Sequence, residues 1–179
     1  MILRRCRFIV ASDAGQDEGH NFEDLGGLVR KVRTDLGIPI EFDDKIRILP
    51  RTAAGPGLLC AIGTIHYECV DGKVDGKDVQ PGLLLYLKPT LLAEGLPLPA
   101  DVLSYSRASE TFPHEPTSDQ WFTEAQFESY RSLGYHMARQ LGGGGRFEDI
   151  PALFEAVGHS LEEAKGSGRT REEEIQEGR

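Results

Sequence analysis

The chain has 179 residues, of which 39% are hydrophobic and 27% are charged, as expected for one soluble globular domain with a sizeable core. Its formal net charge of −9 argues against nucleic acid as a partner, because a protein that binds phosphates needs a basic face. Its opening residues, MILRRCRFIVAS, do not resemble a secretory signal, and no apolar run is long enough for a membrane-spanning helix. Cys6, Cys60 and Cys69 form no C-x-x-C pair, which favours buried, reduced thiols in a cytoplasmic protein.

The first predicted element is a buried parallel strand at Phe8–Ala11, a short apolar run that ends in Ser-Asp-Ala-Gly. Such a strand normally belongs to a larger sheet, so we expect this fold to be incomplete without an upstream region.

An amphipathic helix is predicted next, with Asn21 as its N-cap and negative charge from Glu23 and Asp24 in its first turn. Gly37 is a natural residue to end it, and Pro39 lies just beyond. Apolar residues recur along one helical face, namely Phe22, Leu25, Val29, Val32 and Leu36.

Four further segments are strand candidates: Ile38–Phe42, Lys45–Leu49, Cys60–Val70 and Gly82–Lys88. An eleven-residue connection with two Asp-Gly pairs joins the last two, which predicts an antiparallel pair with a long exposed loop. The proline-rich stretch Glu94–Asp101 is expected to be a surface connection.

The C-terminal part predicts two helices. Thr117 with Gln120, and Thr123 with Gln126, both fit a capping box before a helix that carries Phe127, Tyr130, Gly134, Met137 and Leu141 and stops at GGGG. A shorter helix is predicted over Phe147–Val157. Residues 1–161 then form the domain, and the charged residues 162–179 are expected to be a disordered tail.

Asp13 is the first candidate site residue, because open α/β sheets place functional groups just beyond the carboxyl ends of their strands. The alternative is that Asp13 is a turn or capping residue, and the sequence favours this second interpretation.

The loop from His114 to Trp121 holds the other candidates: His114, Glu115, Asp119, Gln120 and Trp121. Flanking prolines restrict its backbone, so its polar side chains could bind a ligand or anchor the loop against the sheet by hydrogen bonds. A triad of His114, Asp119 and Ser118 is disfavoured because no glycine elbow surrounds the serine. Trp121 and Phe122 form either an exposed apolar edge or a small cluster that packs the loop, and the sequence favours the cluster.

Neither a metal nor a cofactor is expected. The five histidines are scattered and lack the H-E-x-x-H spacing, and the cysteines lack the spacing of a structural zinc site. Gly142–Gly145 follows a helix rather than a strand, so it is not a phosphate-binding loop.

Three segments, FIVASDAG, DLGIPIEF and the long run TFPHEPTSDQWFTEAQFESYRSLG, resemble the C-terminal part of bacterial patatin-like phospholipases. The resemblance spans about Arg4 to Leu141. It implies an α/β fold of three layers, a sheet with flanking helices, in a membrane-associated hydrolase that cleaves lipid acyl esters with a Ser–Asp dyad. The chain has no G-x-S-x-G nucleophile elbow, and Asp13-Ala14-Gly15 departs from the family's D-G-G element.

Two hypotheses follow. The chain is the C-terminal segment of a lipid acyl hydrolase that completes the sheet and shapes the cleft, while an upstream catalytic portion, in the same or a separate chain, supplies the nucleophile and binds the lipid. Alternatively, it is an independent, non-catalytic module that binds a protein or a lipid through the loop from His114 to Trp121. The resemblance places the protein in the cytoplasm, peripheral to the membrane through its parent.

Overall fold

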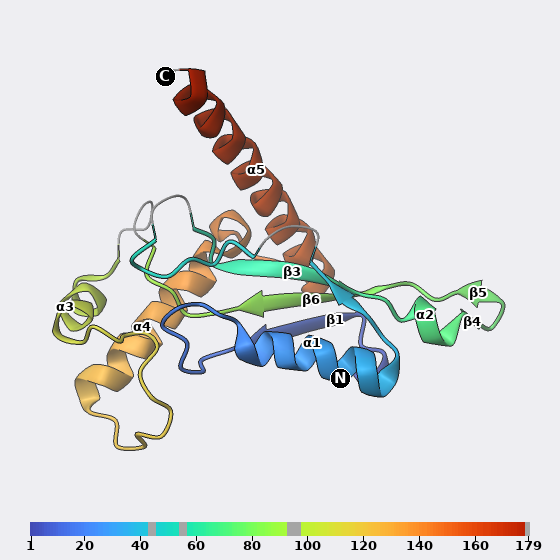
Figure 1. The fold of residues 1–179 in the computed structure, drawn as a ribbon, viewed down its shortest axis with the longest axis horizontal. Helices are drawn as coiled ribbons and strands as arrows, with labels where there is room; N and C mark the ends of the chain where they lie inside the picture. Colours follow the sequence, from blue (N-terminus) through green and yellow to red (C-terminus); the bar gives the residue numbers. More distant parts are fainter. Residues whose placement is uncertain (43–45, 54–56, 93–97, 178–179) are drawn as a thin grey trace.

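The computed structural model describes residues 1–42, 46–53, 57–92 and 98–177, with side chains up to residue 164. Its main feature is a four-stranded mixed sheet in the order β1-β6-β3-β2, formed by Phe8–Ser12, Gly82–Leu87, Cys60–Ile65 and Ile40–Glu41 (Figure 1). β1 runs parallel to β6, with Phe8 opposite Leu83, and the other two pairings are antiparallel. The protein is therefore of the α/β class.

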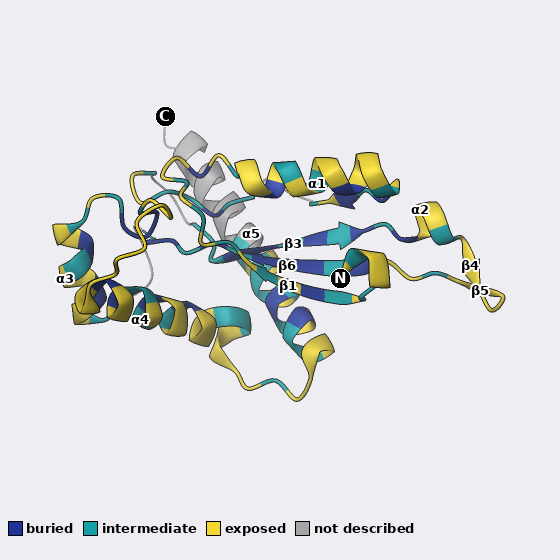
Figure 2. Cartoon of the chain, turned by 90° about the horizontal axis from the view of Figure 1, so that it is seen from below, coloured by how far each residue is buried: buried dark blue, intermediate teal, exposed yellow. Residues whose placement is uncertain are grey.

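Helices cover both faces of this sheet, which gives three layers (Figure 2). α1 (Glu23–Leu36) lies on one face, where Leu25 and Val32 are buried with Ile9 and Leu84. α5 (Ile150–Glu177) crosses the other face, where Phe154 and Val157 pack with the strand residues Cys60 and Leu85. The side chains of each strand alternate between these two layers, as the pleat of a sheet requires.

α1 confirms most of the predicted helix, but its cap differs. Gly37 ends it in the left-handed conformation, with φ 70°, as a residue without a Cβ can. Asn21 is not the N-cap: Phe22 takes that position with φ 55°, and among the described residues its side chain makes no capping hydrogen bond. Instead, the carboxylate of Asp17 accepts hydrogen bonds from the N–H groups of Asn21 (2.7 Å) and Phe22 (2.9 Å).

The antiparallel pair is confirmed as β3 and β6, with Cys60 opposite Leu87. β3 ends five residues earlier than predicted, because the chain turns into the short helix α2 (Glu68–Asp71). The connection then forms a two-stranded hairpin of β4 (Lys73–Val74) and β5 (Lys77–Asp78), which projects from the body (Figure 1).

Two other strand predictions need correction. Ile38–Phe42 contains only the two-residue β2, which leaves Ile38 buried outside the sheet. The prediction over Lys45–Leu49 is wrong for residues 46–49, which have no strand pairing, while Lys45 lies outside the described residues. Ile48 is nevertheless buried in the core beside α1, so its apolar character reflects packing rather than a strand.

Two helices pack near the carboxyl end of β6. α3 (Ala100–Ala108) was not predicted, because its sequence follows prolines and begins inside the expected surface connection. α4 (Glu124–Gln140) confirms the second capping site: Thr123 accepts a hydrogen bond from the N–H of Gln126 (3.2 Å). The glycine stop is also confirmed, as the 3₁₀ turn η2 (Leu141–Gly144).

α5 is much longer than the predicted helix over Phe147–Val157. Its backbone is helical to Glu177, and the helix therefore includes residues 162–177 of the stretch expected to be a disordered, charged tail. Its first turns are apolar and lie on the sheet, while the remainder extends away from the body (Figure 1).

Two further features bear on the sequence predictions. Cys60 is buried and Cys6 partly buried, whereas Cys69 is exposed, so the expectation of buried thiols is wrong for Cys69. None of the described helices is both long enough and apolar enough to cross a membrane.

Candidate functional site

A cluster of charged side chains lies at the carboxyl ends of the two parallel strands. Asp13 directly follows β1 and Lys88 directly follows β6, and parallel pairing brings these ends to the same edge of the sheet. The Nζ atom of Lys88 lies 3.1 Å from Oδ2 of Asp13 and 3.6 Å from Oδ2 of Asp17. Because the Lys88 side chain is only 1% exposed, this is a buried cation held between two carboxylates.

Asp13 has two further partners besides Lys88. Its Oδ2 also accepts a hydrogen bond from the hydroxyl of Tyr86, and its Oδ1 accepts one from the N–H of Gly15 (2.9 Å). Burial alone would raise the pKa of Asp13, but these bonds and Lys88 hold that pKa below its ordinary value. Asp13 is therefore both the turn residue favoured by the sequence and a member of a buried ionic network.

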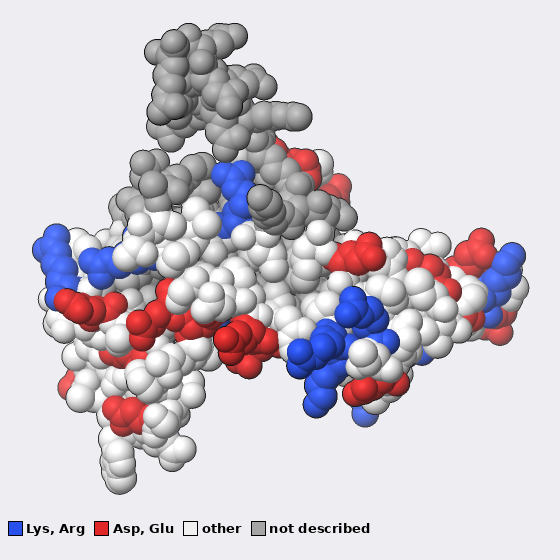
Figure 3. All heavy atoms as spheres, in the orientation of Figure 1, with Lys and Arg blue, Asp and Glu red and all other residues white. Residues whose placement is uncertain are grey.

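Asp17 connects the cluster to α1. Burial opposes its charge, yet the N–H groups of Asn21 and Phe22, together with Lys88, lower its pKa. Further carboxylates, including Glu23 and Asp24, line a cavity of about 360 Å³ beside Asp17. Figure 3 shows acidic side chains gathered around the start of α1 and basic ones around its end, which complements the helix dipole.

Two histidines meet next to this network. The rings of His20 and His114 pack edge to face, with centroids 4.6 Å apart, and the residues are 7% and 5% exposed. None of their ring nitrogens makes a hydrogen bond with the described residues. The backbone carbonyls of Glu18 and Gly15 favour the protonated rings but do not reach hydrogen-bonding geometry.

Their surroundings favour the neutral imidazoles. Burial lowers the pKa of His114 to about 4, and the neighbouring Lys88 and the protonated form of His20 act in the same direction. Burial likewise lowers the pKa of His20, although Asp17 partly opposes this shift. At neutral pH the pair is thus an uncharged, tightly packed contact between the loop after β1 and the loop before α4.

The hydrogen-bonding anchor of the loop from His114 to Trp121 is Glu115. Its Oε1 accepts from the hydroxyls of Tyr105 (2.8 Å) and Ser109 (2.6 Å), and its Oε2 accepts from the Gln126 amide (2.8 Å). Its N–H donates to the Tyr130 hydroxyl at 3.3 Å. Burial opposes its charge, but these donors lower its pKa. The expected side-chain hydrogen bonds of His114 are absent, because neither of its ring nitrogens has a partner among the described residues.

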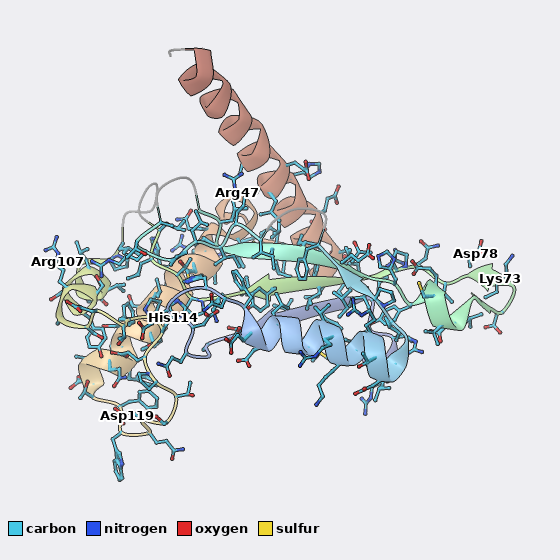
Figure 4. The ribbon with its side chains drawn as sticks, viewed as in Figure 1. Arg47, Lys73, Asp78, Arg107, His114 and Asp119 are labelled. Carbon is cyan, nitrogen blue, oxygen red and sulfur yellow. The ribbon has the colours of Figure 1, made fainter. Side chains whose placement is uncertain are left out.

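The remaining predicted residues lie on the surface. Asp119 accepts a local hydrogen bond from the N–H of Trp121 (3.0 Å), and Gln120 is exposed. Trp121 is 90% exposed and Phe122 is 58% exposed, so the favoured prediction of a packed cluster is wrong and the exposed edge is correct. Figure 4 shows His114 directed into the body and Asp119 at the far end of the loop, so these two cannot act together.

An apolar pocket of about 390 Å³ lies between the loop that follows Asp13 and the loop from His114 to Trp121. Ala14 forms one wall next to Asp13, and Glu115 and the exposed aromatic residues form the other. The lining residues are Ala14, Glu115, Pro116, Thr117, Phe122, Phe127 and Tyr130. The site thus combines a largely buried ionic edge with an adjoining apolar hollow, as ligand sites at strand ends commonly do.

Sequence reasoning missed Lys88, Tyr86, Asp17 and His20. One signal was present: Lys88 ends the apolar run GLLLYLK just as Asp13 follows FIVAS.

Across the described residues, no three His, Cys, Asp or Glu side chains are arranged to hold a metal ion. Comparisons with protein-family models, with curated proteins and with solved structures found no match for this chain.

Proposed function

We propose that this chain is the non-nucleophilic C-terminal part of a patatin-like lipid acyl hydrolase. The sequence resemblance suggests the family, and the observation that carries the role is the apolar pocket beside the Asp13–Lys88 network. A pocket of about 390 Å³ between Ala14 and Phe127 has the size and character to take part of an acyl chain. An upstream catalytic portion, in the same or a separate polypeptide, would supply the nucleophile.

Three serines of the described region, Ser106, Ser109 and Ser129, support a non-nucleophilic role. A nucleophilic serine needs a general base within hydrogen-bond reach. Ser106 and Ser129 donate to backbone carbonyls, and Ser109 donates to Glu115. Glu115 is a poor base for Ser109, because other donors already occupy its oxygens and lower its pKa.

A second candidate is favoured by one observation. Trp121 and Phe122 are exposed at the end of their loop, which suits an independent module that binds a protein or a lipid through this loop. The two candidates differ in whether an acyl chain enters the pocket behind Phe122.

Titration of the purified chain with laurate tests the first candidate. Trp121 is the single tryptophan and adjoins Phe122 of the pocket, so its fluorescence should change saturably. We expect Phe127→Lys to weaken laurate binding at least tenfold, since it places a charge at the pocket wall. Tyr135→Lys is the matched control, because Tyr135 is an exposed aromatic residue on α4 that does not line the pocket.

A fluorophosphonate probe tests the catalytic part of the proposal. We expect no covalent adduct on the isolated chain. An adduct on any serine would show that the chain carries its own nucleophile, and laurate binding unaffected by Phe127→Lys would remove the role of the pocket.

A further inference from the structure

The outer edge of β1 presents unpaired backbone groups. Among the described residues, β1 pairs only with β6. The N–H of Asp13 bonds to the carbonyl of Leu87, and the carbonyl of Arg7 accepts from Leu83, so the odd-numbered residues face β6. Because these directions alternate along a strand, Phe8, Val10 and Ser12 direct their N–H and C=O groups toward the open edge.

Apolar side chains flank this edge on both faces of the sheet. Val10 is 43% exposed on the face that carries α5. On the opposite face, a groove of about 340 Å³ runs between β1 and α1, and Leu3 and Leu28 line it while being 73% and 41% exposed. The strand FIVAS has no proline or charged residue of the kind that protects edge strands from pairing.

We propose that β1 pairs with β1 of a second copy of this chain, antiparallel across a two-fold axis beside Val10. This inference concerns the chain by itself, and a strand from the upstream portion of the proposed hydrolase would compete for the same edge. The axis places Val10 opposite Val10 of the partner subunit, and Phe8 opposite Ser12 of the partner subunit. All three residues of β1 with outward backbone groups then form ladder hydrogen bonds, and the two sheets become one.

The charges at the ends of β1 fit this register and no parallel one. Arg7, which is exposed, comes to lie opposite Asp13 of the partner subunit, whose carboxylate is already bound by its own Lys88, so this register places a second cation beside that carboxylate. A parallel pairing would align the same charges with each other and would not close, whereas the two-fold arrangement is closed. Moving the axis to Ile9 or Ala11 would leave one end of the strand unpaired.

Sedimentation velocity over a concentration series tests the proposal on the full chain. We expect a monomer–dimer equilibrium whose dissociation constant rises at least tenfold in Val10→Lys, which sets two ammonium groups opposite each other. Val74→Lys is the matched control, because Val74 is 57% exposed on the distant hairpin, and it should change the constant less than twofold. Arg7→Glu should also weaken the dimer at least tenfold, whereas Arg107→Glu, on α3, should not (Figure 4).

Cross-linking provides a second readout that does not depend on dissociation. Opposed Cα atoms about 5.5 Å apart suit a disulfide, so Val10→Cys, with Cys6 and Cys69 replaced by serine, should give a covalent dimer on oxidation. Val74→Cys in the same background should not. A chain that stays monomeric at all concentrations, or a dimer that Val10→Lys leaves unchanged, would overturn the proposal.

Discussion

The buried histidine pair should make folding stability depend on pH well above the range in which carboxylates titrate. His114 has a pKa of about 4 in the folded protein and an ordinary value of 6.5 when unfolded. As the pH falls below 6.5, His114 binds a proton in the unfolded chain but stays neutral in the folded chain. The stability that is present above pH 6.5 is therefore lost progressively toward pH 4. With 1.36 kcal/mol for each unit of pKa, the loss between pH 7 and pH 5 is about 2 kcal/mol for this residue.

Urea unfolding of the chain at pH 7 and at pH 5, followed by circular dichroism, measures this loss. The pKa of His20 is also lowered, so it adds to the effect in the same direction. His114→Phe keeps a ring in the contact and should remove about 2 kcal/mol of the difference between the two pH values. His159→Phe is the control, since the His159 side chain is 76% exposed. Equal pH dependence in His114→Phe and the parent chain would refute this reasoning.

Two further predictions concern buried polar groups. Lys88→Met should cost about 3–5 kcal/mol of unfolding free energy, because it leaves the carboxylate of Asp13 without its buried cation. The control Lys73→Met should cost less than about 0.5 kcal/mol, since the Lys73 side chain is 67% exposed. Equal urea midpoints for the two variants would contradict this prediction. Glu115→Ala removes the acceptor for three side-chain donors and should cost about 1–3 kcal/mol of unfolding free energy. The control Glu128→Ala should change the thermal midpoint little. A Glu115→Ala protein as stable as its parent would contradict this prediction.

The local elements were predictable where a short stretch of sequence determines them. α1 has an apolar stripe and a C-terminal glycine, and both act within a few turns of the chain. Short stretches of sequence also predicted the β3–β6 pair, from the Asp-Gly pairs in its connection, and the Thr123 cap of α4, from its capping box. Predictions failed where packing outweighs local pattern: Ile48 is apolar because it is buried beside α1, and Phe127 is exposed although it follows the helical spacing.

The sequence by itself identified Asp13 as a residue at a strand end and Glu115 as part of a constrained loop, because both follow from neighbouring residues. Only the tertiary structure decided their partners. Lys88 is 75 positions from Asp13 along the chain, and it reaches Oδ2 of Asp13 because β6 lies parallel to β1. His20 and His114 likewise come from two loops that meet only when the sheet and α4 are assembled. A charge network of this kind depends on strand order, and strand order is set by the whole packed core rather than by any local run of residues.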